Sequence, residues 1–210
     1  MLQQLFCKPH MGRRLIVLAL SVFVMGAGVA VFDQLGFGTD PCSVLNLGVS
    51  RMIGWSFGNY QLVFNSLLLT VILLCGEARR IGPGTVANMV LVGYSADFCA
   101  WMLNSIHPLH HETLLVRLIV FVPAMAAFLI AVAFYMVVDL GVAPYDALPQ
   151  IIASRQSRLS FSAVRVLWDV AAIAAGIVVG GTVGAVTIIM GFFLGPVISA
   201  IARRFQKWFE

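Results

Sequence analysis

The sequence predicts an all-α, polytopic membrane helix bundle made of two inverted repeats. Each repeat is expected to contain three transmembrane helices and one short half-helix, which is either re-entrant or interfacial. Three features predict this class: the composition, the length of the apolar segments, and a helix break that occurs twice. The 210 residues are 60% hydrophobic and only 10% charged, whereas soluble domains average about a quarter charged residues. The chain has too few polar side chains to cover a water-soluble domain.

Several apolar segments approach or exceed the roughly 18 residues expected of a membrane-spanning helix. A membrane β-barrel would instead show alternating segments of about ten residues, and the sequence has none. We therefore predict one membrane domain over residues 1–210, with the first repeat at about 13–106 and the second at about 114–204. The lipid bilayer is the first expected partner.

The formal net charge of +4 comes from basic residues that stand in pairs at the ends of apolar segments. This is the distribution that the positive-inside rule describes for cytoplasmic loops. It favours cytoplasmic N- and C-termini and argues against a nucleic-acid partner, which would require a concentrated basic patch.

The first expected span covers residues 15–32 and follows Lys8, Arg13 and Arg14. A secretory signal peptide has the same order of charge and apolar residues, but its apolar part is only about 7–15 residues long. The matching run in the second half, residues 114–138, is internal and cannot be a cleaved leader. We therefore expect a retained span.

The first helix break follows this span at residues 35–45. Gly36 and Gly38 permit backbone conformations that a helix does not use. Asp40 before Pro41 is typical of an N-cap followed by proline at the first helical position. The helix expected at 41–53 is roughly 20 Å long, which is less than the roughly 30 Å hydrocarbon core. A re-entrant half-helix is the preferred interpretation, and an interfacial helix is the alternative.

The remaining elements follow the same plan. The expected order is a span at 59–74, a turn at 81–85, a span to about 103, a polar loop at 104–113, a span at 114–138, a second short helix at 144–154, a span at 161–179 and a last span from about 184 to 201.

The two halves match at proline, glycine and paired polar positions. The matches run from Pro41, Leu45, Ser56, Phe57, Gln61, Asn65, Gly82, Thr85 and Gly93 to Pro144, Leu148, Ser160, Phe161, Arg165, Asp169, Gly184, Thr187 and Gly195. If the short helices do not cross the membrane, each half has three spans and the second half is inverted. If they do cross, the chain has eight spans and parallel repeats. The basic residues do not choose between these topologies, but the helix lengths favour six spans.

Polar residues inside the spans are the first candidates for a functional role. Gln61 and Asn65 are four residues apart and share one helix face, as do Arg165 and Asp169. An ionisable residue at the helix centre costs at least about 2.5–3.5 kcal/mol on insertion scales, so Asp169 is expected to face the interior and pair with Arg165. These residues either line a solute path, with Arg165 contacting an anion, or form a structural ion pair that fixes helix register.

The starts of the short helices supply the other candidates. A half-helix N-terminus offers unpaired amide donors and a positive dipole for an anion, while aspartates suit a proton or a cation, so the charge of the solute stays open. The predicted substrate-binding residues are Thr39, Asp40, Ser43, Asn46, Gln61, Asn65, Tyr145, Asp146, Arg165 and Asp169.

No cofactor, metal site or enzymatic reaction is predicted. His107, His110, His111 and Glu112 lie in one short loop without a second ligand cluster, which favours a solvated loop over a zinc site. The four cysteines have no ligand spacing and are expected to be buried thiols. The G-x-S-x-G, H-E-x-x-H and phosphate-loop motifs are absent from the sequence.

The motifs around the breaks resemble those of the YczE/YyaS/YitT-type bacterial membrane proteins. They are Leu35-Gly36-x-Gly38-Thr39-Asp40-Pro41-x-Ser43-x-Leu45, Ser56-x-Gly58-x-x-Gln61, Gly82-x-Gly84-Thr85, Pro144-x-Asp146-x-Leu148, Arg165 with Asp169, Gly180-Gly181-Thr182-Val183-Gly184 and Gly195-Pro196. The resemblance implies a multi-pass helical protein of the bacterial plasma membrane and transfers no reaction.

The paired breaks and the charged residues in the spans favour a small-solute transporter or channel, with a site at the interface between the repeats. Proton or cation coupling is an open part of this prediction. The alternative is a non-transporting membrane scaffold or regulator that acts through a partner protein.

Overall fold

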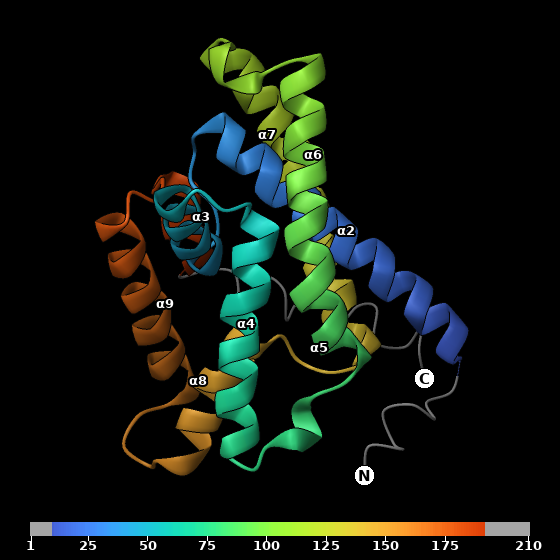
Figure 1. The fold of residues 1–210 in the computed structure, drawn as a ribbon, viewed down its shortest axis with the longest axis vertical. Coiled ribbons are helices and arrows are strands. Elements are labelled where there is room, and N and C mark those ends of the chain that lie inside the picture. Colours follow the sequence, from blue (N-terminus) through green and yellow to red (C-terminus); the bar gives the residue numbers. More distant parts are fainter. Residues whose placement is uncertain (1–9, 192–210) are drawn as a thin grey trace.

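The computed structural model describes residues 10–191, and this part of the chain is all-α (Figure 1). Its helices are α2 (Met11–Leu35), α3 (Pro41–Ile53), α4 (Phe57–Leu74), η1 (Ala78–Arg80), α5 (Pro83–Ala87), η2 (Asn88–Val92), α6 (Gly93–Ile106), η3 (Leu109–His111), α7 (Leu114–Val138), α8 (Pro144–Arg155) and α9 (Phe161–Val178). A further helical segment begins at residue 185 and continues to the last described residue.

Five helices are long and apolar enough to cross a membrane: α2, α4, the continuous α5–η2–α6 segment, α7 and α9. They confirm five of the six predicted spans and establish a multi-pass membrane helix bundle. The sixth predicted span begins in the described residues, but most of it lies beyond residue 191, outside the part that the structure describes.

Two spans differ in detail from the prediction. Helix α2 begins at Met11 and ends at Leu35, so it is longer at both ends than the apolar run at 15–32. The polar end residues are accommodated by packing, since Arg14 is buried and donates to the Val138 carbonyl oxygen at 2.7 Å. The third span contains a π-helical turn, η2, which hydropathy does not reveal.

The short helices α3 and α8 both begin with proline, as predicted. The Asp40 side chain caps α3 by accepting a hydrogen bond from the Ser43 backbone N–H at 3.1 Å. At α8 the N-cap position is held by Ala143, and Asp146 lies in the first turn. The two helices run in opposite directions, α3 toward the end where α4 begins and α8 toward the end where α4 finishes (Figure 1).

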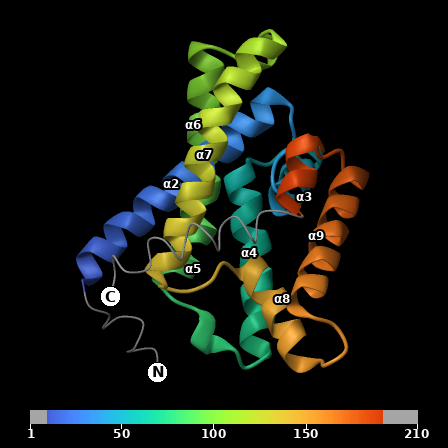
Figure 2. The same ribbon diagram turned by 180° about the vertical axis from the view of Figure 1, so that it is seen from behind.

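Helices from the N-terminal half pack against helices from the C-terminal half. Helix α2 crosses α7 in both views (Figures 1 and 2), α3 packs against α9, and α4 packs against α8. The buried cluster around Phe32 and Phe128 joins α2 to α7, and the cluster around Ile72 and Leu148 joins α4 to α8. The two halves therefore share one core.

The backbone at each break is hydrogen-bonded to the other half of the chain. The Gly84 N–H donates to the Leu140 carbonyl oxygen at 2.8 Å, and the Val186 N–H donates to the Phe37 carbonyl oxygen at 3.1 Å. Thr85 lies beside the first of these bonds and donates to the Val142 carbonyl oxygen at 2.9 Å. The backbone at each break is therefore hydrogen-bonded to the first residues of a helix from the opposite half.

Two arginines occupy related places at the ends of α2 and α7. Arg14 donates to the last residue of α7, and the Arg117 guanidinium lies 4.7 Å from the centre of the Phe37 ring, just beyond the end of α2. A cation near a helix C-terminus is stabilised by the partial negative charge of the terminal carbonyl groups. These contacts hold the two longest helices together at both ends.

Gly184 provides a test of the contact between the halves. A Cβ atom at Gly184 would lie 2.1 Å from the Phe37 carbonyl oxygen, whereas one at Gly12 would meet nothing within 4 Å. We expect Gly184→Ala to lower the free energy of unfolding by about 1–3 kcal/mol or more, because backbone must move to admit the methyl group. Gly12→Ala is the matched control and is expected to change it little. Thermal unfolding in mild detergent measures both, and equal midpoints would contradict the close approach.

Candidate functional site

A polar cluster lies where the short helices α3 and α8 begin, between α4 and α9. Tyr145 and Asp146 come from the first turn of α8, and Arg165 and Asp169 come from one face of α9. The proline at the start of α8 fixes the entry to the helix. It places Tyr145 and Asp146 immediately inside the bundle, opposite the arginine.

Arg165 is bound by two carboxylates. Its Nη1 donates to Asp146 Oδ1 at 2.5 Å, and its Nε donates to Asp169 Oδ2 at 2.9 Å. The Asp169 side chain is only 6% exposed, while those of Arg165 and Asp146 are 26% and 41% exposed. The predicted Arg165–Asp169 pair is confirmed, and Asp146 is a second partner that the sequence did not reveal.

Tyr145 completes the coordination of Asp169. Its hydroxyl donates to Asp169 Oδ1 at 2.8 Å, and the Arg165 guanidinium carbon lies 5.5 Å from the centre of its ring. Both oxygens of Asp169 are therefore hydrogen-bonded, which offsets the cost of burying the carboxylate.

The start of α3 adds a third carboxylate to this region. Asp40 interacts electrostatically with Asp146, and Cys42 interacts with both of them and with Arg165 and Asp169. The region therefore holds one guanidinium, the two carboxylates bonded to it and the Asp40 carboxylate nearby, so it favours positive charge over negative charge when its aspartates are ionised.

Three carboxamide side chains form a second polar group beside α3. Asn46 Nδ2 lies 3.5 Å from Gln61 Oε1 and 3.5 Å from Cys42 Sγ. Asn65 Nδ2 donates to the Gln61 carbonyl oxygen at 3.0 Å. All three carboxamides are buried, and Cys42 connects this carboxamide group to the acidic cluster.

The other two predicted residues, Thr39 and Ser43, lie at the start of α3, next to the first break. Thr39 is buried, with its hydroxyl 3.5 Å from the Asp40 carbonyl oxygen, and Ser43 supplies the backbone donor to the Asp40 cap. The structure thus gathers the ten predicted residues into three adjoining places: the acidic cluster, the carboxamide group and the start of α3.

Cys42 and Trp168 are two residues of this region that the sequence analysis does not predict. Cys42 is expected to be an ordinary buried thiol, but it lies between the two polar groups. Its position matches that of Tyr145 when the two halves are aligned, and this match could have identified it. Trp168 packs against Tyr145 with 5.7 Å between ring centres. Its position beside the cluster follows from the α8–α9 contact and has no sequence signature.

Two other features lie away from this region. A surface depression of about 380 Å³ is lined by Gly54, Trp55, Ser56, Asn59, Leu62 and Val63, none of which is a predicted site residue. In the polar loop His107 Nε2 lies 2.6 Å from Glu112 Oε1. Within residues 10–191 there is no group of three or more His, Cys, Asp or Glu side chains arranged to hold a metal ion.

Comparison with known proteins identifies the family. The model of a family of unknown function, DUF6198, matches residues 12–203, which is nearly the whole chain. The chain belongs to the DUF6198 family. The assignment agrees with the multi-pass helical architecture and carries no reaction.

Two uncharacterized bacterial proteins are similar to this DUF6198 chain. An uncharacterized protein of Haemophilus influenzae is 26% identical over 187 residues, which cover 88% of this chain and 80% of the relative. The uncharacterized protein YyaS of Bacillus subtilis is 23% identical over 139 residues, which cover 66% of this chain and 68% of YyaS. The resemblance to YyaS-type proteins predicted from the motifs is confirmed. No solved structure matches the chain.

The buried ion pair can be tested against an exposed one. Asp169→Asn removes a charged acceptor from Arg165 and Tyr145, and we expect the free energy of unfolding to fall by about 1.5–3 kcal/mol. Asp33 pairs with Arg51, whose side chain is 48% exposed, so Asp33→Asn is expected to cost only about 0–1 kcal/mol. Thermal unfolding in detergent measures both variants. A cost for Asp169→Asn no greater than that for Asp33→Asn would contradict the assigned geometry.

Proposed function

We propose that the protein is a small-solute transporter or channel whose site is the polar cluster between the starts of α3 and α8. The observation that carries the proposal is the Tyr145–Asp169–Arg165–Asp146 network, with Asp40 opposite. Ionisable residues inside a membrane segment are costly and mark solute or ion pathways in many membrane proteins. Partial exposure of Asp146 and Arg165 would let a solute reach the network.

The proposal includes an arrangement as two inverted repeats, which the helix directions support. Helices α2 and α7 run in opposite directions, as do α4 and α9 (Figures 1 and 2). The hydrogen bonds from Gly84 to Leu140 and from Val186 to Phe37 join matching places in the two halves. Transporters with inverted repeats bind solutes at the repeat interface, where half-helices begin.

The short helices suit a re-entrant position. Helices α3 and α8 have 13 and 12 residues, so each is roughly 20 Å long and falls short of the roughly 30 Å hydrocarbon core. Their opposite directions would bring their N-terminal ends together near the membrane midplane. An interfacial position would leave Asp40 and Asp146 on opposite surfaces, which does not fit the electrostatic influence of Asp146 on Asp40.

The charge of the cluster favours a cationic or protonated solute. Asp40, Asp146 and Asp169 outnumber the one guanidinium, and Arg165 is already bound by two of these carboxylates. An anion would have to displace at least one carboxylate before it could contact Arg165. A cation or a proton needs no such exchange.

A non-transporting scaffold or regulator is the second candidate. It is favoured by the pairing of Arg165 with both Asp146 and Asp169, because an arginine bound by carboxylates is also typical of a structural ion pair. Neither candidate assigns an enzymatic reaction to the cluster, since the sequence supplies no recognisable nucleophile and base pair.

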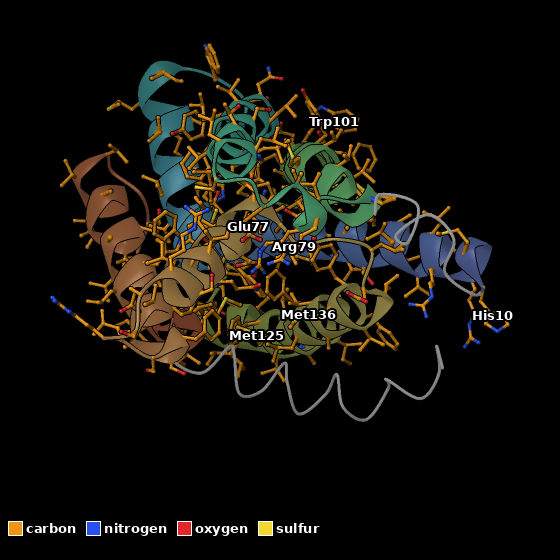
Figure 3. The ribbon with its side chains drawn as sticks, turned by 90° about the horizontal axis from the view of Figure 1, so that it is seen from below. His10, Glu77, Arg79, Trp101, Met125 and Met136 are labelled. Carbon is orange, nitrogen blue, oxygen red and sulfur yellow. The ribbon has the colours of Figure 1, made fainter. Side chains whose placement is uncertain are left out.

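The basic residues support a cytoplasmic N-terminus. Six of the described arginines lie toward the end where α2 begins and α4 finishes: Arg13, Arg14, Arg79, Arg80, Arg155 and Arg158. Figure 3, seen from this side, shows Arg79 beside Glu77, in agreement with their 3.2 Å ion pair. Arg51 and Arg117 lie toward the opposite end. By the positive-inside rule the arginine-rich end faces the cytoplasm of the bacterial cell, and the C-terminus lies outside the described residues.

Uptake by proteoliposomes tests the transport proposal. The probes are ammonium, guanidinium and choline, applied to the full chain and followed as charge movement on a solid-supported membrane. Asp146→Asn is expected to reduce uptake of the transported probe on the order of tenfold or more, because it removes a charged contact from the site. Asp33→Asn is the control and is expected to retain uptake. Equal uptake by folded Asp146→Asn and the unaltered chain would contradict transport through this cluster and favour the scaffold.

Cysteine labelling tests the six-span topology. Arg51→Cys and Arg79→Cys are made singly in a chain whose native cysteines are serine. A membrane-impermeant maleimide added to intact cells is expected to label position 51 and to reach position 79 only after permeabilisation, because α3 finishes at one end of the bundle and the connection from α4 to α5 lies at the other (Figure 1). The reverse pattern would place the arginine-rich end outside the cell, and labelling of both from one side would contradict the inverted arrangement.

A further inference from the structure

Two buried carboxamide oxygens have no hydrogen-bond donor among the described residues. They are Asn46 Oδ1 on α3 and Asn65 Oδ1 on α4, and the two residues are 0% and 2% exposed. Buried side-chain acceptors are nearly always satisfied by protein, ordered water or an ion. Two such acceptors on adjoining helices therefore indicate a bound species.

The unpartnered atom of Asn65 is an oxygen rather than a misassigned nitrogen. Asn65 Nδ2 donates to the Gln61 carbonyl oxygen at 3.0 Å, and this bond fixes the orientation of the carboxamide because a carbonyl oxygen accepts only from the nitrogen. Asn46 Nδ2 faces Gln61 Oε1, so turning the Asn46 carboxamide alone would place two oxygens against each other.

The surroundings of these oxygens favour a cation. The carboxamide group adjoins the acidic cluster through Cys42, whose thiol lies 3.5 Å from Asn46 Nδ2 and which interacts electrostatically with Asp40, Asp146 and Asp169. Neutral oxygen ligands next to excess carboxylate charge suit a hard cation. The ligands themselves are uncharged carboxamides, so a monovalent cation fits them better than a divalent one.

The comparison of the two halves gives the same answer. In the second half, Asp169 accepts hydrogen bonds from the permanent cation Arg165 and from Tyr145. The matching residues of the first half are Asn65 and Gln61, so that half contributes carboxamides where the second contributes an ion pair. A bound cation beside Asn65 would occupy an acceptor oxygen whose counterparts on Asp169 are occupied by Arg165 and Tyr145.

We propose that Asn46 and Asn65 bind a sodium ion, which acts as the coupling ion of the transporter. Its role in coupling rests on the proposed function, but its binding does not require transport. Half-helices and the unwound backbone beside them are the usual sodium-binding elements of transporters with inverted repeats.

Thermal unfolding of the purified full chain in detergent tests sodium binding. Sodium chloride replaces choline chloride at constant ionic strength, and potassium chloride is run in parallel. Sodium is expected to raise the unfolding midpoint in a saturable manner, by about 2–4 °C, because a ligand that binds only the folded state stabilises it. Equal unfolding midpoints in all three salts would overturn the proposal and assign the two acceptors to water.

Variants locate the sodium effect. Asn65→Leu and Asn46→Leu are expected to abolish it, while Asn59→Leu, an exposed asparagine on the same helix α4, should retain it. A sodium-dependent rise that persists in both buried variants would overturn the assignment to these oxygens. The comparison of salts on the unaltered chain needs no variant, so it decides the question even if a variant does not fold.

The same measurements separate the two proposals. A sodium-dependent rise without uptake of any probe would leave the ion site in place and contradict transport. Uptake that is independent of sodium, with no rise in the midpoint, would leave transport in place and contradict the sodium site.

Discussion

The interruption of the backbone within the membrane domain is the constraint on which the rest of the structure depends. Lipid offers no hydrogen bonds, so the N–H and C=O groups released at a break must be satisfied by protein or water. Here each break is bonded to the opposite half: Leu140 accepts from Gly84, and Phe37 accepts from Val186. Glycine at position 184 is required for that contact, because any side chain would collide with the Phe37 carbonyl group. The breaks can exist only because the halves interlock.

Packing between the halves completes the polar cluster. The Tyr145–Asp169–Arg165–Asp146 network lies within the second half, on α8 and α9. Because α3 packs against α9 and α4 packs against α8, Asp40 and the carboxamides of the first half adjoin that network where the short helices begin.

The two halves of the chain bring different polar groups to the place where the short helices begin. The second half carries an aromatic and ionic network around Arg165, and the first carries the carboxamides of Asn46, Gln61 and Asn65. Among the described residues Asn46 Oδ1 and Asn65 Oδ1 have no hydrogen-bond partner, whereas both oxygens of Asp169 are bonded. The two polar groups therefore differ in how completely the protein satisfies them.

The sequence by itself determined the membrane class, five of the spans, the proline-led short helices and the pairing of Arg165 with Asp169. These features depend on local composition and on helical spacing, which the chain displays directly. Tertiary structure alone decided that Asp146 shares Arg165, that Cys42 joins the two polar groups, and that the breaks rest on Gly84 and Val186. Each of those contacts joins residues far apart in the chain, so it depends on how the helices pack, and apolar helices of similar composition leave that packing unspecified in the sequence.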